Sequence, residues 1–258
     1  MRLQEAADVL GVHYQTAYGW VRSGRLPARM VAGGYDLNEA DVRAFSAERR
    51  LGRKPISTIQ VRDWGSQASR LYRAIADGQE TAARRATERL SGHVTITDLC
   101  DLVIAPALRR IGDEWQAGRV SIAREHRATV ICERLIVAAS AQPAGRPRGT
   151  AVVTTPHDER HAVPALMAAA CLRENHWQVH HLACDLPTAE IDTLAAAVGA
   201  DLVVLSTATT AGAMRADKAL RLLQDLDPRF RVLIGHAGDT LDELRNRATA
   251  AHLHRPGA

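Results

Sequence analysis

The sequence predicts a multidomain chain of α and α/β parts: a winged helix-turn-helix, a four-helix bundle and a doubly wound α/β domain. Three observations predict this fold class. Residues 1–55 combine short amphipathic helices with a Gly-Gly turn, residues 66–142 keep a helical period throughout, and apolar strands alternate with helices from residue 148 onwards. With 258 residues, the chain is long enough for each part to bury a core. We expect domains over residues 1–55, 66–146 and 147–258.

The composition narrows the class of protein. Apolar residues make up 46% of the chain, which is typical of a globular protein. The N-terminus lacks the apolar core of a signal peptide, and no apolar run reaches the ~18 residues that span a bilayer, so we expect a soluble, cytoplasmic protein. The charge of +4 is mild, and its Arg-rich make-up suits phosphate contacts but also follows from GC-rich coding. Four cysteines without CxxC spacing indicate buried free thiols.

The N-terminal segment, residues 1–55, has the pattern of a small winged helix. Apolar residues at helical spacing from Leu3 to Leu10 predict a first helix, Gly11 opens a turn, and a second helix follows over about 13–23. Residues 30–37 around a Gly-Gly pair predict a hairpin wing. Asn38, with Asp41 three residues later, predicts the start of a third helix.

The second helix has the features of a DNA-reading element. Ala17, Trp20 and Val21 turn towards the core, so polar and aromatic groups remain on the other face. Such a helix fits a major groove, while basic residues at its end and at the wing reach phosphates; the alternative is a module for protein contacts. The stretch 1-MRLQEAADVLGVHYQTAYGWVRSGRLPARMVAGGYDLNEADV-42 resembles the MerR/excisionase type of winged helix. The expected DNA-binding residues are His13, Tyr14, Gln15, Tyr18, Arg22, Arg25 and Arg29.

A basic linker over about 50–65 precedes the predicted bundle. Its charge either adds a non-specific attraction for phosphate, or the segment is a plain solvated tether. Four amphipathic helices with short connections then predict the bundle. The first two cover Ala68 to Ile75 and Ala82 to Leu90. The third runs over 95–117 with a kink or break near Pro106, and the fourth begins at Ser121.

Strands are expected at 151–155, 178–183, 201–206 and 231–235, with helices at about 161–175, 187–199, 213–226 and 239–250. Continuous Val/Leu runs suit buried parallel strands, whose carboxyl ends form the ligand edge of such a sheet. No GxGxxG or GxxxxGK[ST] motif follows a strand, which argues against the usual dinucleotide and P-loop sites.

The carboxyl edge carries a pattern suited to a metal ligand. Glu159 and His161 follow the first strand, Ser206 and Thr207 the third, and Gly235-His236 the fourth. A His is a good ligand for a first-row transition metal, and a nearby carboxylate fixes its tautomer. One His with only carboxylates beside it makes a poor zinc site, and the remaining alternative is a structural loop histidine.

These residues also carry a resemblance by spacing. Glu159-x-His161-x-x-Pro164 is followed, after the segment 165–205, by Ser206-Thr207-Ala208 and, after the segment 209–234, by Gly235-His236. This series resembles cobalamin-binding domains of the methionine-synthase and mutase type, with Asp-x-His-x-x-Gly, Ser-x-Leu and Gly-Gly at the same spacing. Loop lengths vary freely among unrelated α/β domains, so a double match is informative.

What the resemblance implies is a Rossmann-like cobalamin-binding domain that holds a base-off, His-on corrinoid. His161 is then the lower axial cobalt ligand, and Glu159 is its hydrogen-bond partner. The nucleotide tail passes Ser206, Thr207 and the Gly235-His236 edge, where small side chains leave it room.

A second resemblance lies in the bundle, at 115-WQAGRVSIAREH-126. Its W-x9-EH pattern is similar to the motif that covers the upper face of adenosylcobalamin in MerR-type, cobalamin-dependent light-sensing regulators, the CarH/LitR family. The resemblance implies that Trp115 packs on the adenosyl group and that Glu125 and His126 hydrogen-bond around it. In isolation, a core Trp and a solvated Glu-His pair would be the simpler interpretation.

The chain departs from the family pattern at four positions. Gln116 stands where a histidine captures cobalt after photolysis, which puts that photoproduct in doubt. Pro164, Ala208 and His236 replace a glycine, a leucine and a second glycine, and His236 adds bulk where the tail is expected.

Together the two resemblances and the winged helix imply an adenosylcobalamin-dependent, light-responsive repressor without enzymatic turnover. It is expected to bind operator DNA as a homotetramer in the dark and to release it when light breaks the Co–C bond. Two alternatives remain: a light-insensitive or cobalamin-independent regulator with a degenerate corrinoid domain, and a corrinoid methyl-carrier protein.

Overall fold

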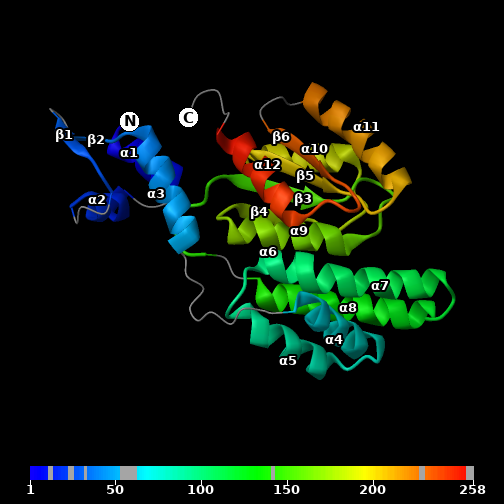
Figure 1. Ribbon diagram of the computed structural model, residues 1–258. Coiled ribbons are helices and arrows are strands. Elements are labelled where there is room, and N and C mark those ends of the chain that lie inside the picture. The colour runs from blue at the N-terminus through cyan, green and yellow to red at the C-terminus, as the bar shows by residue number, and fades with distance from the viewer. Residues whose placement is uncertain are drawn as a thin grey trace. The chain divides into compact units, whose positions relative to one another are not determined.

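The computed structural model describes residues 1–10, 14–22, 26–31, 34–52, 63–140, 143–226 and 230–253. The chain divides into two compact units, one formed by residues 1–58 with 144–148 and the other by 59–143 with 149–258. Figure 1 shows the elements of both units, which are treated one at a time below. No helix in the described ranges is both long and apolar enough to cross a membrane.

The first unit is the expected winged helix. Two helices are followed by an antiparallel hairpin, in which Met30 lies opposite Tyr35, and by a third helix. Leu3, Leu26 and Phe45 lie in one buried cluster that joins these pieces. The carboxamide oxygen of Asn38 accepts the Ala40 N–H at 2.9 Å, as expected for a residue that starts a helix. The elements are α1 (Leu3–Leu10), α2 (Tyr14–Arg22), β1 (Arg29–Val31), β2 (Gly34–Asp36) and α3 (Glu39–Gly52).

The second unit begins with the bundle, whose third helix differs from the expectation. A π-helical turn, η1, interrupts it before Pro106, and the Ala105 N–H donates to the Cys100 carbonyl five residues back. Proline has no N–H to donate, so a break ahead of it leaves Pro106 in the first turn of a new helix, where no bond is lost. The elements are α4 (Trp64–Ala76), α5 (Glu80–Ser91), α6 (Ile96–Leu99), η1 (Cys100–Ile104), α7 (Ala105–Gln116) and α8 (Ile122–Ala139).

The same unit contains the predicted doubly wound domain. In the described residues its sheet has the order β4-β3-β5-β6, and all three pairings are parallel. Side chains alternate across the central strands, so Val153 packs under α9 and α12 while Val152 packs under α10 and α11. The elements are β3 (Thr150–Thr154), α9 (Ala162–Glu174), β4 (Gln178–His181), α10 (Thr188–Ala197), β5 (Leu202–Ser206), α11 (Thr210–Leu226), β6 (Arg231–Gly235) and α12 (Leu241–Leu253).

Helix α9 joins the bundle to the sheet. Its Val163, Met167 and Ala170 belong to the bundle core, while its opposite face packs on the strands, which explains why it is apolar nearly all round. Glu174, which follows this core-forming stretch, accepts the Ile96 N–H at 2.7 Å and so caps α6. In return, Asp101 of η1 accepts the Leu241 N–H at 3.0 Å and caps α12. The bundle and the sheet are therefore linked by shared apolar packing and by two partly buried helix caps, in which a side chain of one part accepts backbone N–H groups of the other.

The thiols lie mainly in this packing. Cys100, Cys132 and Cys171 are free and buried, whereas Cys184 is free and half-buried. Burial raises the pKa of the Cys100, Cys132 and Cys171 thiols, which keeps them protonated and unreactive. The prediction of buried free thiols is confirmed for these three residues.

Candidate functional site

The candidate site begins with Glu159, whose carboxylate joins two loops. The side chain is 1% exposed, although it lies in the loop between β3 and α9. Its Oε1 accepts the His161 Nδ1–H at 2.5 Å and the His161 backbone N–H at 3.2 Å. Its Oε2 accepts the N–H groups of Ala208 and Thr209 at 3.3 and 3.2 Å and the Thr209 hydroxyl at 2.8 Å. Glu159 thus ties the loop after β3 to the loop after β5.

This position is the switch point of the sheet. From β3 the chain proceeds to β4 on one side, while β5 lies on the other side, so the loops that follow β3 and β5 diverge. Ligands of doubly wound sheets bind in the space between such loops, beyond the carboxyl ends of the strands. Glu159 lies between these two loops and holds them together by its hydrogen bonds.

The Glu159 carboxylate stays charged despite its burial. Burial alone would raise the pKa of this carboxyl, but the hydrogen bonds from His161, Thr209 and Ala208 outweigh it and lower the pKa. An ionised Glu159 accepts a hydrogen bond from His161 Nδ1 and donates none, which favours the tautomer with the proton on Nδ1.

His161 presents its other nitrogen outwards. The residue is the N-terminal cap of α9, and its side chain is 59% exposed. With Nδ1 bound to Glu159, Nε2 carries the lone pair, and no second hydrogen bond to the ring is present within the described residues. Pro164 is the third residue of α9, in the first turn, where a missing N–H breaks no helical bond. An imidazole oriented by Glu159, with its other nitrogen unengaged, would suit coordination of a metal ion.

The ends of β5 and β6 form the next part of the edge. Ser206 pairs with Gly235, and the N–H and hydroxyl of Thr207 both donate to the Gly235 carbonyl, at 2.8 and 3.1 Å. Ser206 and Thr207 are buried, and a Cβ placed on Gly235 would meet no atom within 4 Å. This open space is compatible with a chain-like group that passes the strand ends.

The bulky His236 lies beside that space. Its side chain is exposed, and its N–H donates to Asp239 at 2.9 Å in the turn that precedes α12. The turn fixes the backbone of His236, while its side chain remains at the surface.

The turn between α7 and α8 holds the second motif. Trp115, in the last turn of α7, is 43% exposed, and Gln116 ends that helix. In the first turns of α8, Glu125 accepts from His126 Nδ1 at 2.6 Å and from the Thr129 hydroxyl at 2.9 Å. Figure 1 shows this turn and the β3–α9 loop at the same side of the second unit. Because its side chain is exposed, Trp115 is not a core residue, in contrast to the simpler interpretation of the sequence.

Helix α8 contributes a charge near Cys184 and an exposed apolar stripe. Burial raises the pKa of the Cys184 thiol, and the charges of Asp185, Glu133 and Glu159 raise it further. Glu133 of α8 is thus one of the charged groups around Cys184, which follows β4. Val130 and Val137 are exposed, and they share a helical face with Glu133 at spacings of three and four residues. Helix α8 thus carries a stripe of exposed apolar side chains.

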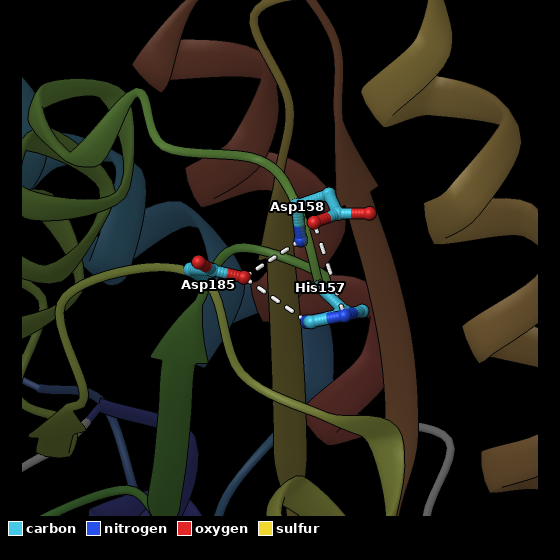
Figure 2. Close-up of side chains that lie close together, drawn as sticks. All are labelled: His157, Asp158 and Asp185. Atoms are coloured by element: carbon cyan, nitrogen blue, oxygen red, sulfur yellow. Dashed lines mark hydrogen bonds and ion pairs between the residues drawn. The ribbon is translucent and has the colours of Figure 1, made fainter.

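A separate polar cluster joins the loop after β3 to the loop after β4 (Figure 2). His157 Nδ1 lies 3.0 Å from an oxygen of Asp185, and the same oxygen accepts the Asp158 N–H at 2.7 Å. That hydrogen bond, together with the nearby charges of His157 and Arg160, lowers the pKa of Asp185. Arg215 lies 3.5 Å from the Asp158 carboxylate. Because cations and an amide already neutralise these carboxylates, the cluster fastens the loops, in accord with the expected loop role of His157 and Asp158.

Two residues of the site, Thr209 and Gly212, were not predicted from the sequence. Gly212 of α11 lies so close to Glu159 that an added Cβ would be 2.1 Å from Oε2. The Thr209 hydroxyl, which donates to Glu159, also accepts the Gly212 N–H at 2.9 Å and so starts α11 three residues before the predicted position. The pattern Thr209-x-x-Gly212 contains a recognisable cap signal, whereas the contact with Glu159 has no sequence signal.

The expected DNA-binding residues lie on the first unit. Tyr14, Gln15, Arg22 and Arg29 are exposed. Tyr18 is half-buried, with its ring 6.2 Å from that of Tyr14 and 5.9 Å from that of Tyr35. It braces α2 against the wing in addition to bordering the exposed face. His13 and Arg25 lie outside the described residues.

Comparison with known proteins identifies each of these parts. A helix-turn-helix domain model matches residues 1–50, and two B12 binding domain models match residues 67–138 and 149–252. A relative, the HTH-type transcriptional repressor CarH of Myxococcus xanthus, is 25% identical over 288 aligned positions, which cover 98% of this chain and 94% of the relative. The chain is a CarH-like cobalamin-binding transcriptional regulator.

Part of the fold of this CarH-like regulator is shared with a solved structure. The monomethylamine corrinoid protein of Methanosarcina barkeri matches with a TM-score of 0.59 at 15% identity, covering 72% of this chain and 98% of that one. The two B12 binding matches fall on the two elements that border the Glu159–His161 pair, the bundle and the sheet.

Proposed function

We propose that this regulator binds adenosylcobalamin between the carboxyl edge of its sheet and the α7–α8 turn, and that light controls its hold on operator DNA. The observation that carries the proposal is the Glu159–His161 pair, in which a buried, ionised carboxylate holds an exposed imidazole with Nε2 outwards. The chemistry of this pair fits an axial nitrogen ligand for cobalt.

The surrounding residues fit the rest of a corrinoid. The space at Gly235, beside the buried Ser206 and Thr207, is where the nucleotide tail would pass. On the bundle side, Trp115 and the stripe of Val130 and Val137 offer exposed apolar surface that a bound ring would cover. Glu125 and His126, already hydrogen-bonded to each other, would meet the polar groups of the adenosyl moiety.

Bound adenosylcobalamin supplies a Co–C bond that visible light breaks. In the dark, Trp115, Glu125 and His126 would hold the adenosyl group, and this contact would stabilise one arrangement of the bundle against the sheet. Without the adenosyl group, Trp115, Glu125 and His126 would lose this partner, and this stabilisation would be lost. A ligand that favours one arrangement shifts the population towards it, which is the physical basis of the switch.

DNA binding would follow from assembly. We propose a cytoplasmic homotetramer in the dark, whose winged helices present Tyr14, Gln15, Arg22 and Arg29, with His13 and Arg25, to operator DNA. Several linked winged helices bind one operator more tightly than a single copy does, because the later contacts are intramolecular. Loss of assembly would therefore release DNA and relieve repression.

A light-insensitive regulator is the second candidate, and Gln116 favours it. A neutral amide does not replace an imidazole as a cobalt ligand, so capture of cobalt by the residue after Trp115 is not expected. His126 is the nearest histidine in the motif, and it is exposed with only Nδ1 engaged. If His126 does not coordinate cobalt after illumination, His126→Ala would leave the absorption spectrum of the illuminated, cobalamin-loaded protein unchanged.

The experiment is reconstitution in darkness followed by illumination. The purified chain is loaded with adenosylcobalamin, and its absorption spectrum, mass in solution and affinity for promoter DNA are measured before and after green light. The proposal predicts a change in all three. A corrinoid spectrum with unchanged mass and affinity would leave the light-insensitive regulator, and the absence of any corrinoid spectrum would leave a cobalamin-independent one.

A further inference from the structure

Positive charge is concentrated in one stretch of the chain. Residues 49–90 contain ten Lys and Arg against four Asp and Glu, a net +6, whereas the rest of the chain contains 23 against 25. The stretch runs from the end of the winged helix through α4 and α5. The basic character of the protein therefore belongs to this segment and not to the surface as a whole.

Within this stretch, four arginines line one open groove on the bundle. Arg70 and Arg73 project from α4, and Arg85 and Arg89 from α5, into a groove of about 440 Å³ that also borders Asp77. Spacings of three and four residues place each pair on one helical face. All four side chains belong to exposed residues.

The nearby carboxylates are engaged elsewhere. Asp77 lies 3.6 Å from Arg124, Glu80 pairs with Arg134 at 2.8 Å, and Glu88 lies 3.4 Å from Arg84. Among the described residues, none of the four groove arginines has an ion pair with an acidic side chain. Four guanidiniums, which stay charged at any ordinary pH, thus share one groove with a single carboxylate, Asp77, in its lining, so the groove keeps a strong excess of positive charge.

We infer that this groove binds the phosphate backbone of double-stranded DNA, as an accessory contact to the winged helix. The inference rests on the proposed function, in which the chain binds operator DNA. Small-molecule pockets are mostly enclosed and apolar, whereas this groove is open and lined by guanidinium groups, which suits a polyanion that runs along it. Figure 1 shows α4 and α5 on the side of the bundle away from the sheet, so the groove is clear of the candidate corrinoid site.

The length of the chain keeps DNA within reach. Twelve residue steps join Gly52, at the end of α3, to Trp64, at the start of α4, and they can span at most roughly 40 Å. That is the length of roughly twelve base pairs at 3.4 Å each. The length of this connection therefore allows α4 to reach the flanking duplex when the winged helix is on its operator.

The test compares salt dependence in full-length protein loaded with adenosylcobalamin in the dark. Binding to a random-sequence duplex of about 40 base pairs is measured between 50 and 200 mM salt for wild type and for the double variants R70Q/R73Q and R85Q/R89Q. Each lost phosphate contact lowers the slope of log K against log salt by about 0.9. For two contacts, the drop from 200 to 50 mM salt should strengthen wild-type binding about tenfold more than it strengthens either variant.

The matched control is K218Q/R221Q, which removes two exposed charges from α11, outside the groove. It should keep the wild-type slope, and circular dichroism confirms that every variant is folded. If wild type itself shows no salt-dependent binding, the proposed DNA function fails. If wild type binds but the groove variants match the control, the inference fails while the function stands. A change in solution mass with an unchanged slope would also overturn it, because the groove would then join two copies of the chain.

Discussion

Replacement of Gly212 by Ala tests whether the packing of Glu159, the hydrogen-bond partner of His161, is needed for corrinoid binding. Gly212 is buried in the first turn of α11, directly against the Glu159 carboxylate. An added Cβ would lie 2.1 Å from Glu159 Oε2 and 3.0 Å from its Cδ. The Oε2 atom therefore has to move by about 1.3 Å or more to reach an ordinary van der Waals separation.

That movement disturbs the contacts that fix Glu159. Oε2 would leave the N–H groups of Ala208 and Thr209 and the Thr209 hydroxyl, and hydrogen bonds to a charged group are worth about 1.5–3 kcal/mol each. The loss is partial, because water and relaxation restore some of them. Changes to the partner of a metal-binding histidine typically weaken metal affinity about 10–100-fold. We expect Gly212→Ala to weaken corrinoid binding within that range and to lower the free energy of unfolding.

The assay is titration of the dark protein with adenosylcobalamin, followed by absorbance, together with thermal unfolding of the unloaded chain. Gly112→Ala is the control, since an added Cβ at Gly112 of α7 meets nothing within 4 Å. In an open helical position Ala is favoured over Gly by up to about 1 kcal/mol, so the control should be neutral or stabilising. If Gly212→Ala is as stable as the control and binds within twofold of wild type, the close packing of Glu159 is not what orients His161.

Three further predictions concern the same two functions. His161→Ala should weaken corrinoid binding or give a base-on spectrum, while His157→Ala, in the neighbouring loop cluster, should leave the spectrum unaltered; identical titrations for both variants would refute axial ligation. Because folding lowers the pKa of Glu159 below its ordinary 4.5, its charge stabilises the fold above pH 4.5, and this contribution is lost as the pH falls through the folded value. Glu159→Gln should therefore flatten the acid limb of melting temperature against pH, and an unchanged limb would show that other carboxylates dominate it. Arg22→Ala should reduce affinity for promoter DNA by about tenfold with no change in corrinoid titration, since Arg22 is an exposed cation in the last turn of α2; equal DNA affinity would remove α2 from the interface.

Much of the architecture could be predicted because its signals are local. Alternating strands and helices, the Gly-Gly hairpin and the cap at Asn38 are all set by neighbours in sequence, and the fold class was confirmed on this basis. The spacing from Glu159 and His161 to Ser206 and Gly235 also pointed to one edge, because parallel strands end together.

Other features depend on contacts between distant residues. The contact of Gly212 with Glu159, and the burial of Glu159 itself, arise only when the loops after β3 and β5 meet. The capping of α6 by Glu174 and of α12 by Asp101 likewise joins residues far apart in the sequence, and no periodicity reports them. The π-helical turn before Pro106 was anticipated only as a break, because proline shows where a helix is disturbed but not how its hydrogen bonds are rearranged.

The central claim is that one bound corrinoid links the Glu159–His161 edge to the hold on DNA. The most direct measurement is the affinity of the adenosylcobalamin-loaded chain for its promoter DNA in darkness and after green light, with His161→Ala measured in parallel. We predict tight binding of the loaded wild type in the dark, a loss of at least about tenfold on illumination, and no light effect in His161→Ala. Equal affinity of the loaded wild type in darkness and in light would contradict the account.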